Sequence, residues 1–251
     1  MAALVVGAFV GVALPQASLP RSRTIVVFEE PFTTSGLCHL PGGRFRYKFG
    51  QRASDFVDTI TRESERRRCG FGQLTCDAFG TPLAVGVFAR VARCDACADG
   101  TGSMVTVDFG GRFVPEDAVQ VEPHKVMRAR ALRDVWRLRP GTGGSALRAD
   151  VRALVARIAE LRLRLAAAGT STVPLCHERA LELDQQLAQP WSAELLSFVA
   201  LGVADVPLMT SKALLVTRDT RERLLYAHEA LVPLAKELEA KAAIQAASAT
   251  R

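Results

Sequence analysis

The sequence predicts an α+β protein in which a β-barrel or β-sandwich is followed by an α-helical bundle. Between residues 23 and 138, short runs rich in Val and Phe recur between turns that contain Gly, Pro or Asp, a spacing typical of an antiparallel or mixed barrel or sandwich. The glycine-rich segment at 139–146, "RPGTGGSA", has the composition of a linker. From 147 to 251 the apolar residues recur at helical spacing instead. We therefore divide the chain into these parts, with residues 1–22 set apart as a targeting leader.

Composition limits the class of protein. Of the 251 residues, 49% are hydrophobic and 23% charged, as in an ordinary globular protein. The net charge of +6 and the pI of about 9.3 permit binding to nucleic acid but do not require it. Six cysteines are too few for a disulfide-rich secreted module.

The first 20 residues, "MAALVVGAFVGVALPQASLP", contain no charged side chain. The apolar run is short for a membrane span, which needs roughly 20 apolar residues, so we expect no span. It has the character of the hydrophobic region of a targeting signal, although no positively charged segment precedes it. The alternative is a buried first strand or helix.

The segment "RFRYKF" at 44–49 alternates strictly, which is the mark of a half-buried strand. Its aromatic residues share one face: Phe45, Tyr47 and Phe49. Its basic residues share the other, which we expect to be solvated: Arg44, Arg46 and Lys48. An earlier strand is predicted at 24–28, and later strands at 70–77, 84–93, 104–109, 118–122 and 124–132.

Helices are predicted at both ends of this series. Residues 53–68 form one, with Ser54 as N-cap, Asp55 in the first turn and Phe56, Val57 and Ile60 facing inward. Its last turn is basic: Arg66, Arg67 and Arg68. In the second half we expect helices at 147–168, closed by Gly169, at 178–188, at 193–204 with Ser192 as cap, and from Asp219, whose spacing to Glu222 is that of a capping box. Pro233 should kink or break this last helix.

Catalytic motifs are lacking. The sequence contains no GxSxG, HExxH, Walker A or GxGxxG motif. Cys38 and His39 are adjacent on an extended segment, so they would point to opposite faces, and the carboxylates of Asp55 and Asp58 suit a solvated helix face. We therefore expect no catalytic residues, no cofactor and no enzyme activity.

One CxxC pair, Cys94 and Cys97, could suggest zinc, but a structural zinc site usually takes four ligands. A second close pair is missing, because Cys69 and Cys76 are seven positions apart and Cys176 and His177 are far away in the sequence. We expect the CxxC pair to lie at a hairpin tip without metal, because the segment "DACADGTGS" is rich in turn residues.

The order of these elements resembles one family. "IVVFEEPF…CHLPGGRFRYKFGQRASDFVDTI" is similar to the start of the Lon protease N-terminal, or substrate-binding, domain, in which a strand is followed by a Pro-Gly turn, an alternating strand and a helix. "AVGVFARVARCDACADGTGSMVTVDFGGRF" and "EPHKVMRARALRD" resemble later strands of that domain, with His124 where an aromatic residue is usual. The helical half is similar in two short motifs: Leu196-Ser197-Phe198 and Glu222-Arg223-Leu224. The resemblance spans about residues 24–235. It departs from the family pattern at Gly50, where an acidic residue is usual, and at Glu29-Glu30, where an apolar-Pro pair is usual.

The resemblance implies a PUA-like β-barrel followed by an α-helical bundle. It also implies a stand-alone Lon-domain protein, of a kind found in bacteria and in plastids, that recognises unfolded or partner polypeptides without hydrolysing them. We expect a role in organellar protein quality control and a plastid location, with mitochondrial and cytoplasmic locations as alternatives. Two other functions stay open. One is an RNA-binding PUA-like module, which would use a continuous basic face that contains Arg44, Arg46, Lys48 and Arg66 to Arg68. The other is a structural subunit of a larger complex. The sequence alone assigns no binding residues.

Overall fold

The protein consists of two compact units. The computed structural model describes residues 5–8, 22–30, 40–66, 70–76, 81–134, 144–168 and 191–249. One unit comprises the described residues up to Arg133 and is mainly β-structure, and the other begins at Asp134 and is helical. The α+β class is therefore confirmed. The division falls after Arg133, whereas the change in sequence texture placed the end of the β-rich part at 138.

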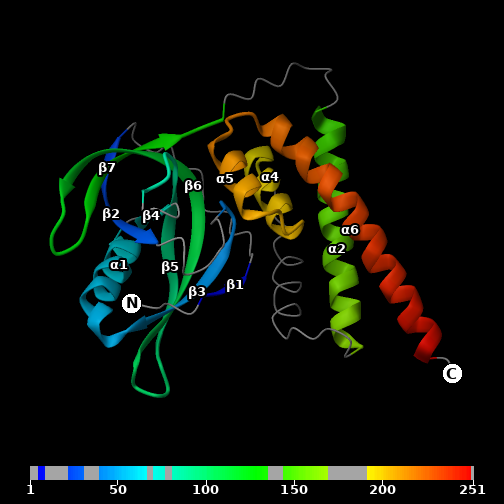
Figure 1. Cartoon of the computed structure of the whole chain (residues 1–251), viewed down its shortest axis with the longest axis horizontal. Helices are drawn as coiled ribbons and strands as arrows, with labels where there is room; N and C mark the ends of the chain where they lie inside the picture. The colour runs from blue at the N-terminus through cyan, green and yellow to red at the C-terminus, as the bar shows by residue number, and fades with distance from the viewer. Residues whose placement is uncertain are drawn as a thin grey trace. The chain divides into compact units, whose positions relative to one another are not determined.

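The first unit is a mixed sheet that closes on itself (Figure 1). Its strands are β1 (Val5–Ala8), β2 (Arg23–Glu30), β3 (Arg44–Gly50), β4 (Phe71–Thr75), β5 (Gly86–Ala96), β6 (Gly102–Gln120) and β7 (Val126–Leu132). The order is β1-β3-β6-β5-β4-β2-β7, and a further pairing between β6 and β7 closes a ring of β6, β5, β4, β2 and β7. Strands β2 and β4 are parallel, and the other pairs are antiparallel.

The length of β6 differs from the prediction. Two strands were expected, at 104–109 and 118–122, but one strand runs from Gly102 to Gln120. Its first half pairs with β3 and β5, and its second half with β7, with register shifts between Pro115 and Gln120. Glycines and bulges let a barrel strand coil and bend without ending, so Gly110-Gly111 does not terminate it.

The barrel interior is filled by aliphatic and aromatic side chains. The cluster consists of Ile25, Val27, Leu74, Phe88, Phe113, Met127 and Ala129. A Cβ atom at Gly86 would lie 2.4 Å from the Phe113 ring and one at Gly72 would lie 2.8 Å from it. These glycines therefore allow the Phe113 ring to lie directly against the backbone of β4 and β5.

The helix of the first unit, α1 (Ser54–Arg66), is packed against the barrel through Val57 and Ile60, which are buried as predicted. The expected N-cap is wrong. Ser54 already has helical dihedrals, because a 3-10 turn, η1 (Gln51–Ala53), leads directly into the helix. Ser64 joins α1 to β5, since its hydroxyl accepts a hydrogen bond of 2.9 Å from the Val91 N–H.

The second unit contains α2 (Gly144–Ala167), α4 (Ala193–Val203), α5 (Leu208–Val216) and α6 (Thr220–Ala249). Helices α2 and α6 lie side by side (Figure 1). The buried residues of α2 recur at helical spacing, as the sequence predicted for this segment, and include Val151, Val155, Ile158 and Leu161. Helix α6 continues through Pro233 without a break. The helix predicted at 178–188 and the closing Gly169 lie outside the described residues.

Side-chain caps define two helix starts as the sequence predicted. The Ser192 hydroxyl accepts a hydrogen bond of 3.1 Å from the Leu195 N–H at the start of α4. The Asp219 carboxylate accepts bonds of 2.7 and 3.3 Å from the N–H groups of Arg221 and Glu222 at the start of α6. None of the described helices is both long and apolar enough to cross a membrane.

Candidate binding surfaces

Strand β3 separates its aromatic and basic residues as predicted. Phe45, Tyr47 and Phe49 are 0%, 1% and 5% exposed. Arg44, on the opposite face, is not simply solvated. It forms a two-point ion pair with Asp108 of β6, with distances of 2.5 Å from Nε to Oδ1 and 3.2 Å from Nη2 to Oδ2. Asp108 is 1% exposed, so this pair compensates a buried carboxylate.

The next basic residues on this face are also paired with acids. The Lys48 ammonium lies 3.0 Å from the Asp99 carboxylate. The hydrogen bond that Lys48 donates to Asp99 raises the pKa of the lysine. The pKa of Asp99 is held well below its usual range, mainly by hydrogen bonds from Thr101 and to a smaller extent by the hydrogen bond from Lys48. On β5, Arg93 Nε lies 2.7 Å from an Asp95 carboxylate oxygen.

The outer face of β3, β6 and β5 is therefore a row of ion pairs rather than an open basic strip. Arg46, between Arg44 and Lys48, is exposed, and Arg66 is exposed at the end of α1. Residues 67 and 68, which completed the basic face expected for RNA, lie outside the described residues. Because carboxylates already occupy much of this face, it is poorly suited to a row of phosphates.

The CxxC cysteines lie on the β5–β6 hairpin. Cys94 is near the end of β5, opposite Val105, and Cys97 begins the turn, where its N–H donates to the Gly102 carbonyl at 2.8 Å. Partial desolvation and the neighbouring Asp95 raise the pKa of the Cys94 thiol. Within the parts of the chain that the structure describes, no group of three or more His, Cys, Asp or Glu side chains could hold a metal ion. That this pair binds no zinc stays a prediction. Cys38, His39, Cys69, Cys176 and His177 lie outside the described residues.

The β6–β7 hairpin carries the most exposed apolar side chains of the first unit. Val119 and Val121 are 56% and 67% exposed. Glu116 fixes the base of this hairpin, because its carboxylate accepts from Ser22 Oγ at 2.9 Å and from Arg130 Nε at 3.1 Å. His124 packs edge-on against the Phe56 ring, with centroids 5.4 Å apart. It therefore takes an aromatic role at the position where the resemblance places an aromatic residue.

The edge of β3 is a second surface that could bind a chain. One side of β3 pairs with β6, and the other side pairs antiparallel with β1 over four residues. Residues 5–8 thus form a strand, which was the alternative considered for this segment. This pairing does not decide whether the segment also acts as a targeting leader, which stays a prediction.

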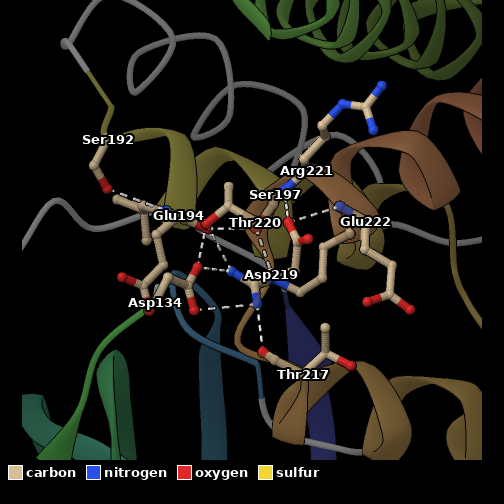
Figure 2. A network of polar contacts seen from close by, with 11 residues as sticks. Asp134, Ser192, Glu194, Ser197, Thr217, Asp219, Thr220, Arg221 and Glu222 are labelled. Atoms are coloured by element: carbon tan, nitrogen blue, oxygen red, sulfur yellow. Dashed lines mark hydrogen bonds and ion pairs between the residues drawn. The ribbon is translucent and has the colours of Figure 1, made fainter. Parts of the chain in front are cut away.

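The second unit is organised by a fully buried arginine, Arg223 of α6. Figure 2 shows the residues that this arginine contacts, among them Asp134, Ser197 and Thr220. Its guanidinium donates to both carboxylate oxygens of Asp134, at 3.3 Å from Nη1 to Oδ1 and in a shorter contact from Nη2 to Oδ2. Nη1 also donates to the Thr217 carbonyl at 2.5 Å, Nη2 contacts Thr220 Oγ1 at 3.3 Å, and Nε donates to Ser197 Oγ at 3.0 Å. All five N–H donors of the guanidinium are thereby satisfied.

Comparison with solved structures gives the fold of the family that the sequence resembles. No protein-family model and no curated protein matches the chain. Among solved structures, the N-terminal domain of a Lon protease of the Mycobacterium avium complex is similar, with a TM-score of 0.51 and 16% identity over 83% of this chain and 98% of that one. This chain has the fold of a Lon N-terminal domain. A Lon N-terminal domain protein from Xanthomonas campestris is also similar, at 20% identity over 81% of this chain and 96% of that one, with a TM-score of 0.46.

In this Lon N-terminal fold, the two short motifs of the helical half meet at one point. Arg223 of the second motif donates to Ser197 of the first, and its guanidinium lies 4.1 Å from the centroid of the Phe198 ring. Ser197 in turn donates to the Glu194 carbonyl at 2.7 Å. The motifs are therefore joined by one buried structural contact, and they do not form an exposed site.

Sequence reasoning assigned no binding residues, and two surfaces were missed. The β6–β7 hairpin was missed because its valines resemble ordinary strand residues. The β3 edge was missed because residues 5–8 were assigned to a leader. An alternation of apolar and polar residues was visible in β3, but the position of a strand in a sheet, at its edge or at its centre, depends on pairings that a local pattern does not contain.

Proposed function

We propose that this protein recognises unfolded or partly folded polypeptides and neither hydrolyses ATP nor cleaves its clients. The observation that carries the proposal is the fold. The structure matches nearly the whole N-terminal domain of a Lon protease, and the sequence resemblance implies substrate binding for that domain. The proposal includes a role in protein quality control within a plastid.

The surface chemistry supports a polypeptide ligand over RNA. Val119 and Val121 present apolar side chains on a projecting hairpin, and exposed apolar surface is a common feature of protein-binding sites. The basic residues of β3 are largely engaged by acids, as Arg44 is by Asp108. The exposed apolar surface is small, so we expect weak binding. The entropy lost when a flexible chain becomes ordered offsets much of the free energy gained from the contacts.

The test is a pair of titrations followed by fluorescence anisotropy. One probe is labelled α-lactalbumin that has been reduced and carboxymethylated so that it stays unfolded, and the other is a labelled single-stranded RNA. Each is titrated at about 50 mM and about 200 mM salt, a range over which a protein with many phosphate contacts loses several orders of magnitude in affinity. Native α-lactalbumin is the matched control.

We expect the unfolded probe to bind with little salt dependence and the native one not to bind. Tight RNA binding that weakens steeply with salt, without binding of the unfolded protein, would reject the proposal in favour of an RNA-binding module. ATPase and protease assays on the same preparation should show no turnover.

A further inference from the structure

Strand β1 shows what the β3 edge can accept. Residues Val5–Ala8 pair antiparallel with β3 in the register Val5↔Tyr47, Val6↔Arg46, Gly7↔Phe45 and Ala8↔Arg44. Strand β1 stands at the end of the strand order, and β3 is the neighbour with which it pairs. Strand β1 is thus held at the edge of the sheet by a single four-residue pairing with β3, whereas each strand of the closed ring pairs with a neighbour on both sides.

The occupant of this edge is a short, uncharged, extended segment. The sequence VVGA lies within the stretch of the first 20 residues that contains no charged side chain. Main-chain pairing to a strand edge requires an extended backbone with free N–H and C=O groups, and it tolerates many side chains. A segment of this kind is also what an unfolded polypeptide exposes, because its apolar stretches are no longer buried in a core.

We propose that the edge of β3 is the polypeptide-binding site and that residues 5–8 occupy it as a built-in competitor. This inference rests on the proposed function and names the site for it. A client segment would add to β3 as an antiparallel strand after β1 leaves, and it would replace the hydrogen bonds that β1 made. Removal of the leader, if residues 1–22 are cleaved, would open the site permanently.

The competition has a measurable consequence. A competitor in the same chain acts at a high effective concentration, so it lowers the fraction of molecules with a free edge. If β1 occupies the edge about nine-tenths of the time, the apparent Kd for a client is about tenfold weaker than for an open edge.

The decisive experiment clamps β1 in place in the full chain by the double substitution Val6→Cys and Arg46→Cys. The register puts these two residues opposite each other, and opposite residues of an antiparallel pair have Cα atoms about 4.5–5.5 Å apart, within the range of a disulfide. Binding of labelled, reduced and carboxymethylated α-lactalbumin is measured with the clamp oxidised and after reduction. Disulfide formation is checked by mass spectrometry.

We expect binding to be lost in the oxidised clamp and restored on reduction. Arg46→Cys alone is the control, and its binding should be the same under both redox conditions, which accounts for native thiols such as Cys94 and Cys97. A second pair of variants opens the edge instead. Val6→Pro removes an N–H and disfavours the strand, so it should bind the probe about tenfold more tightly than Val6→Ala, which keeps the N–H.

The outcomes separate this inference from the proposed function. If the oxidised clamp binds as well as the reduced one, or if Val6→Pro and Val6→Ala bind equally, clients bind elsewhere and only the inference fails. Failure of the two cysteines to form a disulfide would also overturn it, because β1 would then not lie on β3 in this register. If no form of the protein binds the unfolded probe, the proposed function itself fails.

Discussion

At the scale of single residues, Arg223 makes a buried network of contacts that no motif in the sequence predicted. Its side chain is 0% exposed and its partner Asp134 is 6% exposed. Removing one member of a buried ion pair leaves an uncompensated charge, which typically costs about 3–5 kcal/mol. We therefore expect Arg223→Met to lower the free energy of unfolding by about this amount, measured by urea denaturation followed by circular dichroism.

The matched control is Arg221→Met, two positions away on the exposed face of α6, for which we expect a change within about 0.5 kcal/mol. Adding Asp134→Leu to Arg223→Met should recover part of the loss, because the orphaned carboxylate is then gone. Equal stability of Arg223→Met and Arg221→Met would show that the buried network does not hold the unit together.

A second prediction at this scale concerns the protonation of Asp99. Its carboxylate accepts from the N–H of Thr101 at 3.0 Å and from Thr101 Oγ1 at 2.6 Å, and it pairs with Lys48. These contacts favour the charged form and so lower the pKa of Asp99. With a folded-state pKa below the unfolded value of about 3.9, this group contributes stability above that value and loses it as the pH falls through the folded pKa.

An NMR titration of the Asp99 side-chain carboxyl carbon should therefore give a midpoint below that of a model peptide. Thr101→Val and Lys48→Met should each raise this pKa, because each removes a hydrogen bond that favours the charged form, and the bond from the Thr101 hydroxyl is the largest single cause of the shift. A midpoint near that of the model peptide, or no change of the midpoint in Thr101→Val, would contradict this account.

At the scale of elements, the β5–β6 hairpin depends on a glycine where the chain enters β6. Gly102 has a φ of 155°, and a Cβ atom there would lie 1.9 Å from the Phe49 carbonyl oxygen. Since Gly102 pairs with Gly50 at the end of β3, a side chain would push the two strands apart. Gly102→Ala should destabilise the protein by about 1–3 kcal/mol from the backbone conformation alone, and the close approach to the Phe49 carbonyl adds to this cost.

Gly111→Ala, in the same strand, is the control for this substitution. A Cβ atom at Gly111 has nothing within 4 Å, so its thermal midpoint should stay close to that of the parent. If the two variants unfold at the same temperature, the close approach of β3 and β6 at Gly102 does not constrain the hairpin.

Elements differ in how much of them the sequence predicts. Strand β3 was predicted with its buried face because a period of two is a local signal, and Ser192 and Asp219 were found because capping is a local interaction. The start of α1 was misplaced because a 3-10 turn continues into the helix without a capping residue at Ser54. The single strand β6 was read as two because glycine ends a strand in an open sheet but permits bending in a barrel.

At the scale of the whole molecule, the two units have cores that are stabilised by different kinds of contact. In the first unit, β-strands close around a cluster that includes Phe88 and Phe113, whose rings lie 4.9 Å apart. In the second, apolar faces of α2, α4 and α6 meet, and the buried polar contact of Arg223 joins α4, α6 and Asp134. The change of hydrophobic period in the sequence placed the end of the β-rich part at 138, whereas the first unit ends at Arg133. The sequence did not predict the buried network, because a buried arginine cannot be distinguished from a surface arginine until its partners are known.

Because each unit has its own core, a core substitution should loosen one unit and leave the other as it is. Phe45→Ala removes a side chain that is 0% exposed and whose ring packs 5.4 Å from that of Phe109, at a cost of about 3–5 kcal/mol. We expect hydrogen exchange, followed by mass spectrometry, to accelerate in β3, β5 and β6, with α2, α4 and α6 unchanged. Arg223→Met should give the reverse pattern, and Arg46→Ala, at an exposed position beside Phe45, should leave both units at the parent rate. If Phe45→Ala accelerated exchange in α2 and α6 as strongly as in β3, the two units would unfold as one, and the division after Arg133 would describe geometry without describing stability.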